Sequence, residues 1–196
     1  MFWQEVHSFD QQLTLTINSC NSAITDPIWQ FFSEKLVWAP MYAAIIAFAI
    51  WRLGWKKGLI VVAAALLTFG FCDQFSNLIK AAVGRIRPLH DEFMLSHGLH
   101  VLERGGGYSF FSAHAANAFG LACSTYIGLR TDSRLKYRGY AGWMFFWAAM
   151  VSISRIFVGK HYLGDVLVGM IIGAAAGLAF GLLARMLINK YFSTKE

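Results

Sequence analysis

The residues best suited to chemistry lie in one short stretch, residues 154–165, between two long apolar segments. If the chain is helical after His161, the His161 imidazole and the Asp165 carboxylate lie on one helical face. The carboxylate could then accept a hydrogen bond from one ring nitrogen and leave the other free. This arrangement prepares a nucleophilic or basic histidine. Arg155 would add a planar fork of donors, which suits phosphate.

A simpler interpretation exists for each of these residues alone. Arg155 and His161 could be interfacial anchors whose polar ends reach the headgroups, and Asp165 could cap a helix. Residues elsewhere in the chain favour a functional site instead. They are Lys80 with Arg87 and Pro88, and then Ser112, Ala113 and His114; within the first stretch, Ser154 adjoins Arg155.

Three fixed cations, two histidines and one carboxylate suit an anionic tetrahedral substrate that is held for attack. Lys80, Arg87 and Arg155 would neutralise its equatorial oxygens. The Ser112 hydroxyl and backbone N–H groups near Ala113 would add donors.

Pro88 restricts the preceding backbone and would stiffen the loop that aims Arg87. Since the Asp, Glu, His and Cys residues show no metal-ligand spacing, we expect no metal and no cofactor.

The composition indicates a membrane protein. Of 196 residues, 57% are hydrophobic and 16% aromatic, and the mean hydropathy is +0.48. We therefore expect an all-α, polytopic helical bundle that forms a single domain over residues 1–196. The net charge of +6 resides mostly in short connections between apolar segments, which favours membrane anchoring over nucleic-acid binding.

The hydrophobic pattern predicts about five membrane spans after an amphipathic, interfacial N-terminal segment, residues 1–26. Asp26 and Pro27 would open a first helix that continues through Trp51. The other expected spans are residues 58–79, 110–129, 139–158 and 162–188.

An odd number of spans decides which connections share a side of the membrane. The basic turns 52–57 and 130–138 lie on the side of the C-terminal tail, which the positive-inside rule makes cytoplasmic. All the candidate residues then face the opposite side. We expect a protein of the bacterial cytoplasmic (inner) membrane with a periplasmic site.

These motifs resemble those of the type 2 phosphatidic acid phosphatase superfamily, whose signature is Lys-x6-Arg-Pro, Pro-Ser-Gly-His and Ser-Arg-x5-His-x3-Asp. The first part matches at Lys80 and Arg87, and the third matches from Ser154 to Asp165. In the middle part Phe111 replaces the usual proline and Ala113 the usual glycine. The motifs span residues 80–165.

The resemblance implies that His161 attacks phosphorus and becomes a phosphohistidine, while Asp165 holds its tautomer. His114 would protonate the departing oxygen and then activate water. The implied partner is a phosphorylated lipid in the membrane, and the implied activity is that of a lipid phosphatase.

Undecaprenyl pyrophosphate is the first expected substrate, because the chain is short, lacks a large added domain and is expected to face outward. Lipid A phosphate and phosphatidylglycerol phosphate are alternatives, and a lipid phosphotransferase would use the same residues. A non-catalytic lipid-phosphate binder or transporter would need only the cations. The oligomeric state does not follow from the sequence.

Overall fold

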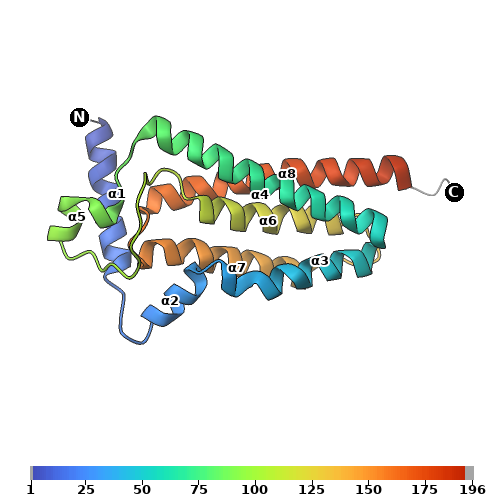
Figure 1. Ribbon diagram of the computed structural model, residues 1–196, viewed down its shortest axis with the longest axis horizontal. Helices are drawn as coiled ribbons and strands as arrows, with labels where there is room; N and C mark the ends of the chain where they lie inside the picture. The colour runs from blue at the N-terminus through green and yellow to red at the C-terminus, as the bar shows by residue number, and fades with distance from the viewer. Residues whose placement is uncertain (1, 193–196) are drawn as a thin grey trace.

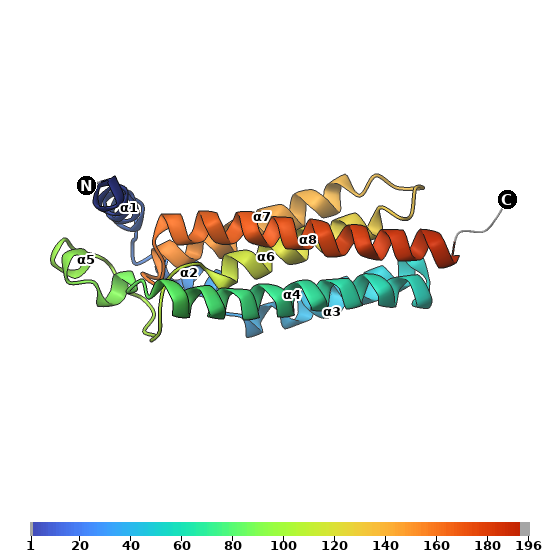
Figure 2. The same cartoon turned by 90° about the horizontal axis from the view of Figure 1, so that it is seen from above.

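The computed structural model describes residues 2–192, and within this range it is all-helical. Five long helices run side by side (Figures 1 and 2). They are α3 (Ala39–Leu53), α4 (Trp55–Val83), α6 (Ala113–Leu129), α7 (Arg138–Phe157) and α8 (Leu163–Phe192). Three further helices, α1 (Phe2–Asn18), α2 (Asp26–Ser33) and α5 (Glu92–Ser96), gather toward one end of the bundle. Two 3-10 turns complete the helical elements: Leu36–Trp38 and Pro88–His90.

The prediction of a helical membrane bundle is confirmed. Three helical segments, beginning at Leu36, Trp55 and Leu163, are long and apolar enough to cross a membrane by themselves. The helix α6 has only 17 residues, and α7 carries arginine near both ends. Both lie within the bundle, so the five long helices correspond to the five predicted spans.

The prediction of one continuous helix from Asp26 to Trp51 is wrong. The chain leaves the helical conformation at Glu34, where φ is −80° and ψ is 124°, and α3 begins again at Ala39. Pro40 lies in the first turn of α3, a position that proline tolerates, whereas inside a longer helix it would remove a hydrogen bond and clash with the preceding turn.

The helix α4 extends further than the predicted second span. It ends at Gly84, which adopts the left-handed conformation (φ 64°) that favours glycine. Lys80 therefore projects from the last turn of a helix and not from a loop.

Glycines bring α8 very close to α6. A Cβ atom added at Gly173 would lie 2.1 Å from the carbonyl oxygen of Ala116, and one added at Gly169 would lie 2.5 Å from that of Ser112. Small residues at such contacts allow the backbones of membrane helices to approach closely. This packing places the N-terminal ends of α6 and α8 together, and the Ser112 N–H donates to the Asp165 carbonyl oxygen at 3.0 Å.

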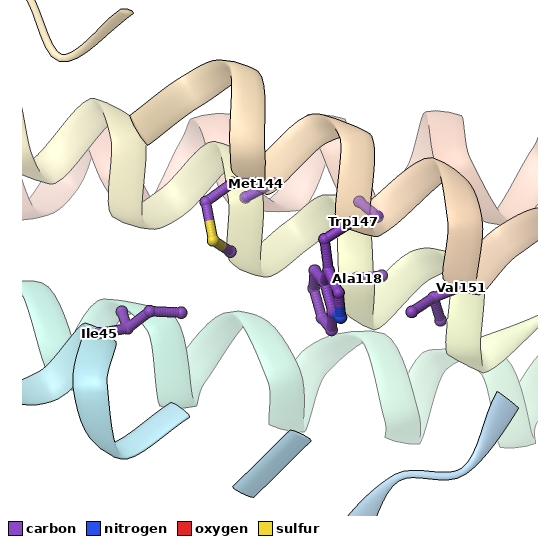
Figure 3. Packing of buried hydrophobic residues seen from close by; sticks show 7 residues of the cluster. Ile45, Ala118, Met144, Trp147 and Val151 are labelled. Carbon is purple, nitrogen blue, oxygen red and sulfur yellow. The ribbon is translucent and has the colours of Figure 1, made fainter. Parts of the chain in front are cut away.

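Larger side chains fill the space between α7 and α3. Figure 3 shows Met144, Trp147 and Val151 of α7 pointing to the side where Ile45 of α3 lies, with Ala118 of α6 beside them. This cluster fixes α7, and with it the arginine near the C-terminal end of α7.

The N-terminal segment forms the predicted helix, α1, and lies across the end of the bundle (Figure 1). Its polar residues Gln11, Thr14 and Asn18 are buried against the protein. Val6 and Phe9, on another side of the helix, are exposed. The polar edge of α1 is therefore a structural contact, and the location of its apolar edge in the membrane surface stays a prediction.

Candidate active site

The three motif regions meet at one cavity of about 300 Å³ at the end of the bundle that carries α1 and α5. Six of the predicted site residues line it: Lys80, Arg87, Ala113, His114, Arg155 and His161. The remaining lining residues are Lys35, Asp73, Asn77, Gly105, Gly106 and Lys160. Within the described residues 2–192 these side chains make a strongly cationic pocket with two imidazoles.

The two nitrogens of His161 face different surroundings. Its Nδ1 lies 3.5 Å from the Asp165 Oδ2 atom, as the four-residue spacing predicts. Its Nε2 lies 3.5 Å from Nη1 of Arg87, on the cavity side. The helix α8 starts at Leu163, so His161 ends the preceding turn and Asp165 lies in the first helical turn. The carboxylate therefore faces one nitrogen while the other remains available to a substrate.

Asp165 is completely buried and has partners that sequence reasoning missed. Arg85 Nη1 donates to its Oδ1 at 2.7 Å, and the hydroxyl of Ser109 donates to its Oδ2. The Tyr162 backbone N–H adds a third donor at 3.1 Å. These contacts fix the carboxylate that orients His161. The only sequence signal for Arg85 was its position two residues before Arg87.

Arg85 and the start of α8 are held in turn by α1. Asp10 accepts from Arg85 Nη2 at 2.7 Å and from the Gly164 backbone N–H at 2.8 Å. The Thr14 hydroxyl oxygen accepts from the Leu163 N–H at 2.9 Å. These are N–H groups of the first turn of α8, which have no partner inside the helix. A helix expected only as an interfacial segment thus supports Arg85 and the start of the helix that carries Asp165.

Burial lowers the pKa of His161, because a buried imidazolium loses hydration; Asp165 opposes this shift, while Arg155 and Arg87 add to it. The free ring is therefore neutral at pH 7, which is the form of imidazole that can attack phosphorus.

Arg155 is fixed by residues from two other segments. It is 2% exposed, donates to the Ser33 hydroxyl at the end of α2, and lies 3.6 Å from Glu103. Glu103 also pairs with Lys160 Nζ at 2.6 Å. Burial opposes ionisation of Glu103, but the contacts with Lys160, Ser33 and Arg155 hold its pKa below the usual range.

Ser154 and Pro88 lie beside the cavity and not in its wall. The buried Ser154 hydroxyl donates to the Val151 carbonyl oxygen at 2.7 Å, within α7. Pro88 is buried and opens the turn that follows Arg87. A supporting role for both residues stays a prediction.

Ser112 is the N-cap of α6: its buried Oγ accepts from the Ala115 N–H at 3.4 Å. The side chain is not part of the cavity wall, whereas Ala113 is. Contact between the Ser112 hydroxyl and phosphate therefore stays a prediction, and the hydroxyl has a visible role in starting the helix that carries His114.

A second cavity, of about 400 Å³ and mainly apolar, lies between α3, α4, α6 and α7. His114 and Lys35 line both cavities, so the two meet there. Its walls include Leu66, Phe69 and Trp147. Such a space among membrane helices suits hydrocarbon chains, and it joins the cationic cavity on the side of His114.

No group of three or more His, Cys, Asp or Glu side chains that could hold a metal ion occurs in residues 2–192. The positive charges that line the cavity belong to lysine and arginine side chains.

Comparison with known proteins agrees with this geometry. The sequence model of the PAP2 superfamily matches residues 53–188 of this chain. The chain belongs to the PAP2 superfamily. It is a membrane protein and a hydrolase that acts on phosphoric esters.

Two relatives cover most of this PAP2 chain. A lipid A 4′-phosphatase of Bacteroides thetaiotaomicron is 36% identical over 181 residues, which are 91% of this chain and 78% of the relative. A lipid A 4′-phosphatase of Porphyromonas gingivalis is 31% identical over 172 residues, 86% of this chain and 70% of the relative.

The fold also resembles a solved PAP2 structure, that of a transmembrane phosphatidylglycerolphosphate phosphatase from Bacillus subtilis. The two structures superpose with a TM-score of 0.69, and the two sequences are 20% identical. The match covers 97% of this chain and 90% of that one. At this identity the similarity shows the fold alone.

Proposed function

We propose that this membrane lipid phosphatase removes the 4′-phosphate from lipid A through a phosphohistidine on His161. The observation that carries the proposal is the position of the His161 Nε2 atom. It faces a cationic cavity that meets an apolar cavity at His114. The choice of lipid A is supported by the two 4′-phosphatases that match most of the chain.

The first step is in-line attack of Nε2 on phosphorus. The N–P bond forms, the bond from phosphorus to the sugar oxygen breaks, and His114 gives its proton to that oxygen. Lys80, Arg87 and Arg155 neutralise the charge of the phosphoryl oxygens in the transition state. Asp165 stabilises the positive charge that develops on the His161 ring.

In the second step, water attacks the phosphohistidine. His114, now neutral, takes a proton from the water, the N–P bond breaks, and inorganic phosphate leaves with His161 restored. The cycle requires no divalent metal, because the three cations supply the charge neutralisation.

This proposal changes the first expected substrate. The choice of undecaprenyl pyrophosphate rested on the length of the chain and on the expected orientation of its site. The choice of lipid A is instead supported by two lipid A 4′-phosphatases that match most of the chain. The test below also distinguishes a preference for phosphatidylglycerol phosphate, and transfer of the phosphoryl group to another lipid, from hydrolysis of lipid A.

The test is phosphate release from purified protein in mixed micelles, with lipid A, phosphatidylglycerol phosphate and undecaprenyl pyrophosphate compared at equal surface concentration. We expect the highest kcat/KM on lipid A, a product that keeps the phosphate at position 1, and unchanged turnover in EDTA. A higher kcat/KM on either other lipid, or activity that is lost in EDTA and restored by Mg²⁺, would contradict the proposal.

We also propose that the cavity opens to the periplasm, because the opposite end of the bundle carries most of the basic turns. A cysteine at Gly106 should react with an impermeant thiol reagent in intact spheroplasts, and a cysteine at Ser133 should not. The reverse pattern would place the site in the cytoplasm.

A further inference from the structure

The helix α4 presents more than Lys80 to the catalytic cavity. Asp73 and Asn77 also line it, at positions seven and three residues before the lysine. Residues at this spacing share one helical face, and Asp73 lies about 10 Å along the helix axis from Lys80, toward the middle of the bundle. A carboxylate in a cavity built for an anion opposes phosphate binding, so it requires another explanation.

Neither of these polar side chains is hydrogen-bonded to another described residue. Within residues 2–192, Asp73 and Asn77 form no side-chain hydrogen bond and no salt bridge. By contrast, Asp91 accepts from the Tyr162 hydroxyl, and Glu103 pairs with Lys160. The Asp73 carboxylate interacts with the charge of Lys80 only beyond ion-pair distance. A carboxylate in this position among membrane helices is costly, and such residues commonly bind a substrate.

A third unpaired group lies on α6. The Oδ1 atom of Asn117 is buried without a hydrogen-bond partner, one turn after His114. Asn117 lines the apolar cavity, which starts at His114 and Lys35. Uncommitted acceptors from α4 and α6 therefore lie on the side of the catalytic cavity that leads to the apolar one.

The chemistry along the two cavities thus has an order. Along α4, Lys80 is followed by Asn77 and Asp73 in the cationic cavity and then by Phe69 in the apolar one, and along α6 His114 is followed by Asn117. A substrate that fits this order has phosphate, a core with hydroxyl or amide N–H donors, and hydrocarbon chains. In a polyprenyl phosphate the hydrocarbon begins at the carbon that bears the phosphate oxygen, so nothing would pair with these acceptors.

We propose that Asp73, Asn77 and Asn117 form a subsite for the polar core of the leaving group, and that its ligand is an acylated sugar. The subsite rests on the proposed phosphatase function and adds the basis of its specificity. Asp73 accepts from sugar hydroxyl or amide groups, while the phosphate is bound by the cations at the outer end of the cavity.

The experiment compares two phosphomonoesters, an acylated glucosamine 4-phosphate and farnesyl phosphate, with Asp73→Leu, Asp73→Asn and Asn77→Leu. The matched control is Gln74→Leu, because Gln74 is the neighbour of Asp73 on α4, is exposed and does not line the cavity. Asp73→Leu should lower kcat/KM on the sugar lipid about 10- to 100-fold, because a site built to bind polar groups loses a pairing.

The ratio of kcat/KM on the sugar lipid to kcat/KM on farnesyl phosphate should therefore fall about 10- to 100-fold in Asp73→Leu and stay within about twofold of the wild-type ratio in Gln74→Leu. Asp73→Asn should lose less kcat/KM on the sugar lipid, since its amide oxygen still accepts a hydrogen bond. If Asp73→Leu does not fold, Asn77→Leu should show the same difference in kcat/KM between the sugar lipid and farnesyl phosphate. Equal losses on both lipids, or no loss on either, would overturn the subsite alone. A wild type that releases no phosphate from either lipid would overturn the proposed function and the subsite with it.

Discussion

Two carboxylates at opposite ends of the bundle, Asp165 and Asp132, are both held by arginine, and only Asp165 lies beside the candidate active site. Asp132 lies in the turn between α6 and α7. It accepts from Arg52 Nη2 at 2.7 Å, from Arg134 Nε at 2.7 Å and from the Tyr137 hydroxyl at 2.9 Å. Its partners connect α3, the turn and the start of α7.

Asp165 is bound as firmly, but one of its neighbours is the titratable ring of His161, whose other nitrogen faces a cavity. The Asp132 cluster adjoins neither of the two cavities described above. Ion pairing therefore does not distinguish a catalytic carboxylate from a structural one. The distinction lies in whether the chain of contacts ends at a reactive atom.

Among the tests of this comparison, Asp165→Asn is expected to have the largest effect on kcat. An amide keeps the shape but cannot stabilise the imidazolium that develops on His161, so kcat should fall about 10³- to 10⁴-fold. Phosphate release from lipid A by the purified variant measures this. A loss below about tenfold would mean that Asp165 serves packing, like Asp132.

His114→Ala tests the other imidazole of the cavity. General acid catalysis contributes about 10²- to 10⁴-fold, and most where the leaving oxygen needs a proton. The burst of phosphorylation should fall strongly on an alkyl lipid monophosphate and noticeably less on p-nitrophenyl phosphate. Equal losses of burst rate on both substrates would mean that His114 mainly positions the phosphate.

Asp10→Asn should have a smaller effect, since Asp10 acts on the site only through Arg85 and the start of α8. We expect kcat to fall about tenfold with KM nearly unchanged, because the phosphate-binding cations are not altered. Glu5→Gln removes the same charge from an exposed position of α1 and is the control. A rise of KM without a change of kcat would argue against a role through Asp165.

Asp132→Asn should leave kcat unchanged and lower the melting temperature by roughly 2–6 °C. Hydrogen bonds from Arg134 and Tyr137, opposed by burial, hold the pKa of Asp132 well below its usual range. The stability that this carboxylate contributes is therefore complete above the usual pKa of aspartate and is lost as the pH falls toward the lower folded value. The melting temperature of the wild type, but not that of the variant, should show this acid-dependent loss. A loss of kcat in the well-folded variant would break the distinction between the two ends.

The sequence was sufficient for the helical bundle and for the meeting of the motif regions in one cavity. Apolar segment lengths predict the long helices, and the number of spans places Lys80, His114 and His161 at one end. The four-residue spacing between His161 and Asp165 predicts that the two side chains are neighbours. Because α8 starts only at Leu163, the turn before the helix also helps to set their contact.

The contacts missed from the sequence join residues far apart in the chain. Asp10 and Arg85 are separated by 75 positions, and Ser109 and Asp165 by 56. No periodicity relates such residues, and only the packed structure brings them together. Likewise, the sequence of α1 alone predicts that its polar edge faces solvent. No neighbouring residue in the sequence indicates that the N-terminal end of α8 covers this edge.

The central claim is that Nε2 of His161 carries the phosphoryl group during turnover. Rapid acid-free quenching of His114→Ala with p-nitrophenyl phosphate, followed by peptide mass spectrometry, tests it most directly. The leaving group of this substrate has little need of a general acid in the first step, whereas the second step is slowed, so the intermediate accumulates. We predict one added phosphoryl group on the peptide that contains His161, stable to base, labile to acid and absent in His161→Ala. Phosphorylation at another residue, or a burst of product without any covalent phosphoenzyme, would contradict the account.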